Sequence, residues 1–147
     1  MGMFTAINSA ASGLTAERFR MDVISHNIAN VNATRTAEGG PYRRQMVVFA
    51  PREGDGGSFD SLLSKAQGTG VDNGVRVIGI AKSQEPFKTV YDPGHPDANR
   101  EGYVLLPNVE IVNEMVDLIT ASRAYEANVT TINTAKSMAM KALDIGK

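Results

Sequence analysis

The longest regular pattern of apolar positions lies near the C-terminus, where residues 108–143 contain neither proline nor glycine. Apolar or aromatic side chains recur there at alternating steps of four and three, which is typical of the seam of a coiled coil. The positions of this series are Ile111, Met115, Leu118, Ser122, Tyr125, Val129, Ile132, Lys136, Ala139 and Leu143. The pattern predicts a helix over 108–143, with Asn108 as its N-terminal cap and Gly146 as its C-terminal stop.

A second apolar pattern, at the N-terminus, predicts a helix over residues 4–29. Its main stripe has a spacing of seven and consists of Ile7, Leu14, Met21 and Ile28. Gly13 lowers the intrinsic helix propensity by about 1 kcal/mol, so we expect this helix to need a partner. Because both ends of the chain share the seven-residue spacing, we expect the two helices to pack antiparallel. The C-terminal helix is expected to face this stripe with Leu118, Tyr125, Val129 and Ile132.

The middle of the chain is rich in residues that interrupt helices. All six prolines and eleven of the 14 glycines lie between positions 32 and 107. Residues 45–49 and 75–81 have the composition of strands, and residues 87–91 are a third candidate. Residues 92–107 read as a series of turns, because they combine proline and glycine with aspartate and asparagine.

A glycine-rich segment at residues 50–74 separates the first two predicted strands. Six glycines in 25 residues raise the entropy cost of ordering it, so we predict a mobile loop. Phe59 and Leu62 are spaced by three, which predicts a short helical turn at residues 58–65 within that loop.

These patterns together predict a mainly α protein with a small β insert. An antiparallel coiled-coil pair of N- and C-terminal helices is joined by a short β-rich middle segment. Residues 1–31 and 108–147 are expected to form one discontinuous helical core domain, and residues 32–107 the insert. At roughly 1.5 Å per residue the C-terminal helix runs on the order of 50 Å, which is too long for a compact domain of this size.

Composition excludes several classes of protein. The 15 basic and 16 acidic side chains give a net charge of -1, without the basic excess of a nucleic-acid binder. The chain has no cysteine, which excludes disulfides, thiolate metal sites and a cysteine nucleophile. No apolar run approaches the roughly 20 residues that span a bilayer, so we expect no membrane insertion. The first 20 residues also lack the features of a cleaved signal peptide.

Candidate chemistry is sparse. The chain has neither a phosphate-binding glycine loop followed by lysine nor a nucleophile elbow. Asp22 and His26 are four residues apart on one helical face, but two ligands alone make a weak metal site. A second acidic group, at residues 92–101, is better explained by turn formation. We therefore expect no catalytic residue, no cofactor and no metal.

Three asparagines crowd the end of the first helix, at Asn27, Asn30 and Asn32. Asparagine is a poor residue inside a helix and a good one at its end, but termination alone needs only one of them. Their amides carry donors and acceptors that could also bond a neighbouring chain. Termination alone and termination combined with an interface both remain open.

The segment that contains these asparagines, residues 25–32, resembles the N-terminal motif of the bacterial flagellar rod and hook family. Residues 122–128 resemble the C-terminal helix motif of that family. In the middle, residues 39–44 and 91–109 resemble the C-type proximal-rod subunits of the flagellar basal body. The resemblance runs nearly from end to end and leaves no room for the larger middle domains of distal-rod and hook relatives.

The resemblance implies a structural subunit rather than an enzyme. Such a subunit self-assembles into the proximal rod, the drive shaft that transmits motor torque around the export channel. The implied partners are other proximal and distal rod subunits, the rod-base adaptor, the membrane-supramembrane ring and the flagellar type III export apparatus. The implied location is the extracytoplasmic, periplasmic rod of the basal body, reached without a cleaved signal peptide. The alternative is a helical-hairpin export chaperone or adaptor.

The apolar stripes, the asparagines and the resemblance together predict a set of subunit-interface residues. They are Ile7, Leu14, Met21, Asn27, Ile28, Asn30, Asn32, Leu118, Arg123, Tyr125, Asn128, Val129 and Ile132.

Overall fold

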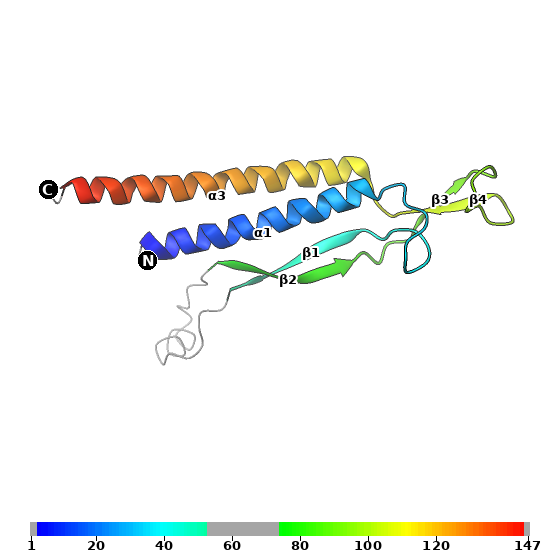
Figure 1. Cartoon of the computed structure of the whole chain (residues 1–147), viewed down its shortest axis with the longest axis horizontal. Coiled ribbons are helices and arrows are strands. Elements are labelled where there is room, and N and C mark those ends of the chain that lie inside the picture. Colours follow the sequence, from blue (N-terminus) through cyan, green and yellow to red (C-terminus); the bar gives the residue numbers. More distant parts are fainter. Residues whose placement is uncertain (1–2, 53–73, 146–147) are drawn as a thin grey trace, which may run out of the picture. The chain divides into compact units, whose positions relative to one another are not determined.

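The computed structural model describes residues 3–52 and 74–145. Helix α1 and helix α3 lie at the two ends of the sequence, and the described residues between them form four short strands (Figure 1). The elements are α1 (Met3–Ala29), β1 (Gln45–Pro51), β2 (Val75–Lys82), β3 (Lys88–Tyr91), β4 (Tyr103–Leu106) and α3 (Ile111–Ile145). This order confirms the mainly helical fold with a small β insert. Most of the predicted loop at residues 50–74, including Phe59 and Leu62, lies outside the described residues, as does Gly146.

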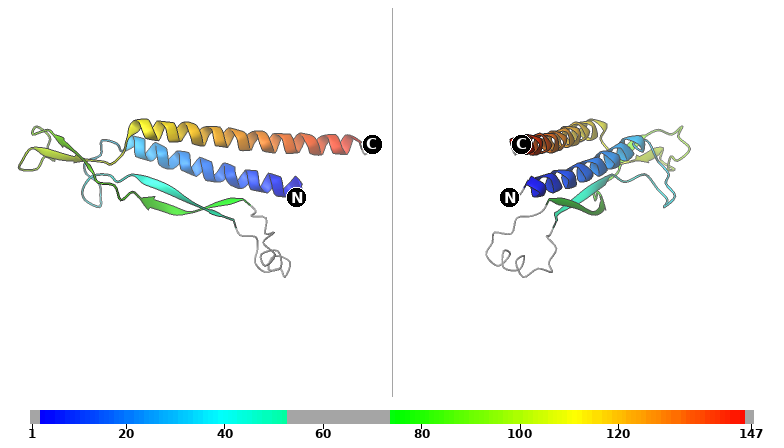
Figure 2. Two further views of the ribbon diagram at one scale, coloured as in Figure 1. Left: turned by 180° about the vertical axis from the view of Figure 1, so that it is seen from behind. Right: turned by 60° about the vertical axis from the view of Figure 1, so that its left-hand side comes forward.

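The contacts within the chain divide it into two compact units. Among the described residues, the first unit combines 3–18, 49–52, 74–78 and 122–145. The second unit combines 19–48 and 79–121. Each unit contains a stretch of α1 and a stretch of α3, which lie side by side (Figures 1 and 2). The division into a helical core and a middle insert, with boundaries after residue 31 and before residue 108, stays a prediction.

In the first unit, small side chains let the two helices approach closely. Ala10 and Ala16 of α1 and Ala135 of α3 are buried. A Cβ atom added at Gly13 would lie 2.9 Å from the Asn128 Nδ2 atom, so this glycine leaves room for the Asn128 side chain. On β2, the backbone N–H of Val75 donates to the Ser12 hydroxyl at 3.0 Å. Helix α1 therefore contacts both α3 and β2 within this unit.

In the second unit, the end of α1 meets the beginning of α3. Val23 and Ile24 of α1 are buried there, as is Ala121 of α3. Asn27 contacts Glu114, whereas Arg20, two turns earlier, contacts Asp117. Later residues of α1 thus meet earlier residues of α3, which confirms the antiparallel pairing. The supercoiled geometry of a coiled coil stays a prediction.

The strands form two separate two-stranded sheets, β1 with β2 and β3 with β4. In the second sheet the strands are antiparallel, and Tyr91 is paired with Tyr103, with ring centroids 5.3 Å apart. Gly102 precedes β4 with φ +82°, a backbone conformation that favours glycine. The prediction of turns alone over residues 92–107 is therefore wrong in its last part, because Tyr103–Leu106 is a strand.

The face of α3 that meets α1 differs from the predicted seam. The buried side chains of α3 are Glu114, Ala121 and Ala135, at positions separated by multiples of seven. Leu118, Tyr125, Val129 and Ile132 are half-buried, as are Ile7, Leu14, Met21 and Ile28 of α1. Ile111, Met115 and Leu143 of the predicted seam are 46%, 52% and 71% exposed. The predicted seam is thus half-buried along its middle part, whereas its large apolar side chains near the helix ends are exposed.

Candidate functional site

A buried polar cluster lies where α1 ends and α3 begins. Asn27 is 1% exposed, and its amide forms four hydrogen bonds. The Nδ2 atom donates to the Gln45 carbonyl at 2.8 Å and to Glu114 Oε2 at 3.0 Å. The Oδ1 atom accepts from the Tyr42 hydroxyl at 2.9 Å and from the Gln45 backbone N–H at 3.0 Å. The hydrogen-bonding capacity of this amide is therefore fully used inside the chain.

Glu114, in the first turn of α3, is fully buried. Its Oε1 atom accepts from Arg44 Nε at 2.5 Å, and Arg44 Nη2 donates to Asp117 Oδ2 at 3.1 Å. Asp117 Oδ1 accepts in turn from Arg20 Nη2 of α1 at 3.4 Å. A buried carboxylate is costly unless it is paired and hydrogen-bonded, and Glu114 has both an ionic and an amide partner. Asn27, Tyr42, Arg44, Gln45 and Glu114 are called the Asn27 cluster below.

The backbone of Arg44 is held by residues from two other segments. Its N–H donates to Asn108 Oδ1 at 2.8 Å, and its C=O accepts from the Ser83 N–H at 2.8 Å. The prediction that Asn108 caps the helix is wrong, because α3 begins at Ile111 and Glu110 supplies the first accepting carbonyl, to the Glu114 N–H. The Asn108 side chain accepts a hydrogen bond from the Arg44 backbone N–H instead.

Charge and burial in the cluster act on two ionisable groups. Burial of Tyr42 and the nearby negative charge of Glu114 both raise the pKa of its phenol. Burial of Arg44 works to lower the pKa of its guanidinium, but the hydrogen bond and charges of Glu114 and Asp117 outweigh it, and the pKa is raised. Arg44 therefore stays protonated and Tyr42 stays neutral at physiological pH.

The structure separates the three asparagines that the sequence grouped together. Asn27 is internal, as described above, whereas Asn30 donates to the His26 carbonyl at 2.8 Å and completes the end of α1. Asn32 is exposed. Arg123 is also exposed, and Asn128 is half-buried with its Nδ2 donating to the Ala124 carbonyl at 3.0 Å. Contact of the predicted interface residues with other subunits stays a prediction.

Sequence reasoning missed Tyr42, Arg44, Gln45 and Glu114 as members of this cluster, and Asn108 as a partner of Arg44. Their partners are distant in the sequence, because Arg44 and Glu114 are 70 positions apart and Asn27 and Glu114 are 87 positions apart. A usable signal was the acidic Glu114 seven residues before Ala121, on the same face of the helix. Another was the segment at residues 39–44, which contains both Tyr42 and Arg44.

A stripe of exposed apolar side chains covers the first turns of α3 on the side away from the cluster. Its members, called the α3 stripe, are between 46% and 69% exposed and comprise Ile111, Val112, Met115, Val116 and Ile119. Further along the helix the exposed side chains are mostly polar, as at Arg123, Glu126 and Thr130. Large contiguous apolar surfaces on a soluble chain mark interaction sites. The α3 stripe is therefore a candidate assembly surface.

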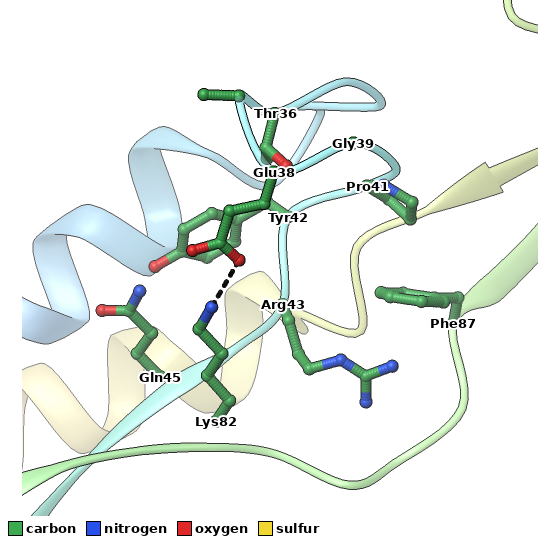
Figure 3. Close-up of a pocket in the computed structure, with 10 residues that line it drawn as sticks. Thr36, Glu38, Gly39, Pro41, Tyr42, Arg43, Gln45, Lys82 and Phe87 are labelled. Carbon is green, nitrogen blue, oxygen red and sulfur yellow. Dashed lines mark hydrogen bonds and ion pairs between the residues drawn. The ribbon is translucent and has the colours of Figure 1, made fainter.

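An open pocket of about 560 Å³ lies beside the segment at residues 36–45, within the second unit (Figure 3). At its edge Lys82 Nζ donates to Glu38 Oε2 at 2.6 Å, and this hydrogen bond and the lysine charge lower the pKa of the Glu38 carboxyl. Arg43 extends toward Phe87, with its guanidinium carbon 4.4 Å from the ring centroid. Lys82, Glu38 and Arg43 are thus already engaged within the chain.

In the part of the chain that the structure describes, no three His, Asp or Glu side chains come together in a way that could hold a metal ion. Neither α1 nor α3 contains a stretch apolar and long enough to cross a membrane.

Two family models match the chain. One, described as flagella basal body rod protein, matches residues 7–35, and the other, described as flagellar basal body rod FlgEFG protein C-terminal, matches residues 100–145. The first range contains Asn27, and the second contains Glu114 and the α3 stripe.

The chain is also similar over its full length to flagellar basal-body rod proteins FlgC. It is 53% identical to that of Borreliella burgdorferi, over 99% of this chain and 98% of the relative. It is 50% identical to that of Bacillus subtilis and 40% identical to that of Escherichia coli O157:H7, over the whole of both chains in each case. The chain therefore belongs to the flagellar basal-body rod protein family and is a structural subunit of the proximal rod.

Proposed function

We propose that the chain enters the rod by burying its α3 stripe against neighbouring subunits, and that the resulting shaft transmits motor torque around the export channel. The observation that carries the proposal is the exposure of five apolar side chains on one helix, from 46% to 69%. Each such side chain contributes about 1.5–3 kcal/mol when it is fully removed from water. Residues 3–52 and 74–145 leave the stripe uncovered, so we propose that its burial comes from assembly.

Membership of the rod family implies association with other basal-body rod components in the flagellar basal body. The specific partners that we propose are proximal and distal rod subunits, the rod-base adaptor and the membrane-supramembrane ring. Export by the flagellar type III apparatus is proposed to bring the subunit to the periplasmic rod. Neither nucleic acid nor direct membrane insertion has a part in this proposal.

The relatives are structural rod proteins, and we propose that this chain likewise has no catalytic role. Polar groups of the Asn27 cluster are engaged with one another rather than open to a substrate. We also keep the predicted interface set as part of the proposal, apart from Asn27, whose amide is fully used inside the chain. Its half-buried apolar members on α1 and α3 flank the contact between the two helices and retain exposed surface for a neighbour.

The experiment compares two matched aspartate substitutions on the outward side of α3. Val116→Asp places a charge in the α3 stripe, whereas Thr130→Asp places one two heptads later at an exposed polar position. Burying an unpaired carboxylate costs several kcal/mol, so Val116→Asp should abolish rod formation and motility while Thr130→Asp preserves both. Normal rods and swimming with Val116→Asp would contradict the proposal. Failure of both variants would show that the effect is not specific to the stripe.

A further inference from the structure

We infer that the Asn27 cluster couples the order of the middle segment to the pairing of the two helices. In this arrangement residues 42–45, and with them the start of β1, are fully held only while the end of α1 and the start of α3 are together, since the bond from the Ser83 N–H holds the Arg44 carbonyl alone. The inference goes beyond the proposed function, because it does not depend on which subunit covers the α3 stripe.

Segments remote in the sequence hold the backbone of residues 44 and 45. Asn27 of α1 pairs with both the N–H and the C=O of Gln45, as the backbone of a neighbouring strand would. Asn108, just before α3, accepts from the Arg44 N–H. Strand β1 begins at Gln45, so its first residue is held by a side chain from the helix.

The members of the Asn27 cluster depend on one another for their hydrogen bonds. Glu114 is fully buried, and its two oxygens accept from Asn27 and from Arg44. If α3 leaves, Arg44 and Asn27 each lose a charged partner, and if α1 leaves, Glu114 and Gln45 each lose an amide partner. A partly satisfied buried network is less favourable than a complete one, so we expect the contacts to form and break together.

The coupling has a consequence for a subunit in which α1 and α3 are not paired. In that state Asn27 is not in place to accept from the Gln45 N–H, and Glu114 is not in place to accept from the Arg44 guanidinium, whereas Asn108 also donates to the Glu85 carbonyl of the insert. The middle segment then lacks the bonds that fix its entry into β1. Helix pairing at the ends of the chain would thereby be transmitted to the insert, within a single subunit.

Hydrogen exchange of the Arg44 and Gln45 amides, measured by NMR on the purified full-length chain, tests the coupling. Glu114→Gln removes the negative charge of the cluster but leaves Asn27 and Asn108, the direct partners of these amides, unchanged. We expect exchange at both amides to rise by about tenfold or more. The control Glu126→Gln makes the same chemical change at an exposed position of α3 and should leave both rates unchanged.

The coupling would be overturned if both amides stay protected in Glu114→Gln and the Gln45 amide loses its protection only in Asn27→Ala. The hydrogen bonds of the two amides would then be independent of one another. If Glu114→Gln loses its helical circular dichroism, Tyr42→Phe decides, since it removes one hydroxyl and no charge. Tyr42→Phe should raise exchange at Arg44 as well as at Gln45, although the phenol contacts neither amide directly. Unchanged exchange of the Arg44 amide in Tyr42→Phe would also overturn the coupling. A Gln45 amide that opens independently of the Ile24 amide of α1 in the native chain would do the same.

Discussion

Gly13 of α1 lies so close to Asn128 of α3 that a Cβ atom at position 13 would be 2.9 Å from Asn128 Nδ2 and 3.2 Å from its Cγ. Such separations are shorter than ordinary van der Waals contact. The glycine lowers the helix propensity of α1 by about 1 kcal/mol relative to alanine, but it makes room for the Asn128 side chain. Two opposing effects therefore meet at this one position.

Gly13→Ala alone is expected to lower the free energy of unfolding, because the Asn128 side chain must move. When Asn128→Ala is already present, the same change is expected to raise the free energy of unfolding by up to about 1 kcal/mol, because alanine has the higher helix propensity. The measurement is the free energy of unfolding in urea for the single variants and the double variant. A stabilising Gly13→Ala in both backgrounds would contradict the close contact between the helices.

Arg44→Lys is expected to destabilise the chain although it keeps the positive charge. A guanidinium reaches Glu114 through Nε and Asp117 through Nη2, whereas a single ammonium cannot reproduce that fork. We expect a loss of about 1–3 kcal/mol in the free energy of unfolding, because a buried carboxylate is left with fewer donors. Arg123→Lys, at an exposed position of α3, is the matched control and should have little effect. Equal stability of the two variants would show that the fork geometry is unimportant.

The raised pKa of Tyr42, caused by burial and by the charge of Glu114, predicts a loss of stability at alkaline pH. Because the folded chain holds this proton more tightly than the unfolded chain, the contribution is fully present below the unfolded pKa, near 10. It is lost as the pH rises through the higher folded value. Tyr42→Phe should therefore flatten the decline in unfolding free energy above pH 10, measured in urea at several pH values. Tyr91→Phe, at an exposed tyrosine, is the control, and an equal flattening in both variants would contradict the assignment.

The two helices could be predicted from the sequence because two long segments without proline, one of them with the single glycine Gly13, carry a regular apolar spacing. The face of α3 that meets α1 could not. Val112, Val116 and Ile119 are apolar but exposed, whereas Glu114 is charged but buried. An apolar stripe that packs inside the chain has the same sequence pattern as one that packs against another chain. Only the residues that contact each stripe distinguish the two.

The Asn27 cluster was predictable only as an accumulation of asparagines at a helix end. Its structure depends on Arg44 and Glu114, which the fold brings together from different elements. The strand at Tyr103–Leu106 was missed because it has four residues, and turn-forming residues precede it. Local patterns therefore identified the long elements, and contacts between distant residues determined the site.

The most direct test of the account is the accessibility of position 116 before and after assembly. The native chain has no cysteine, so Val116→Cys introduces a single reactive thiol into the α3 stripe. Thr130→Cys introduces one at an exposed polar position of the same helix. Maleimide labelling of the free subunit and of isolated basal bodies should show that the Val116→Cys thiol reacts in the free chain and is protected in the rod. Labelling of Val116→Cys that is equally fast in both states, in rods that form normally, would contradict the claim that the α3 stripe is the surface through which this subunit assembles.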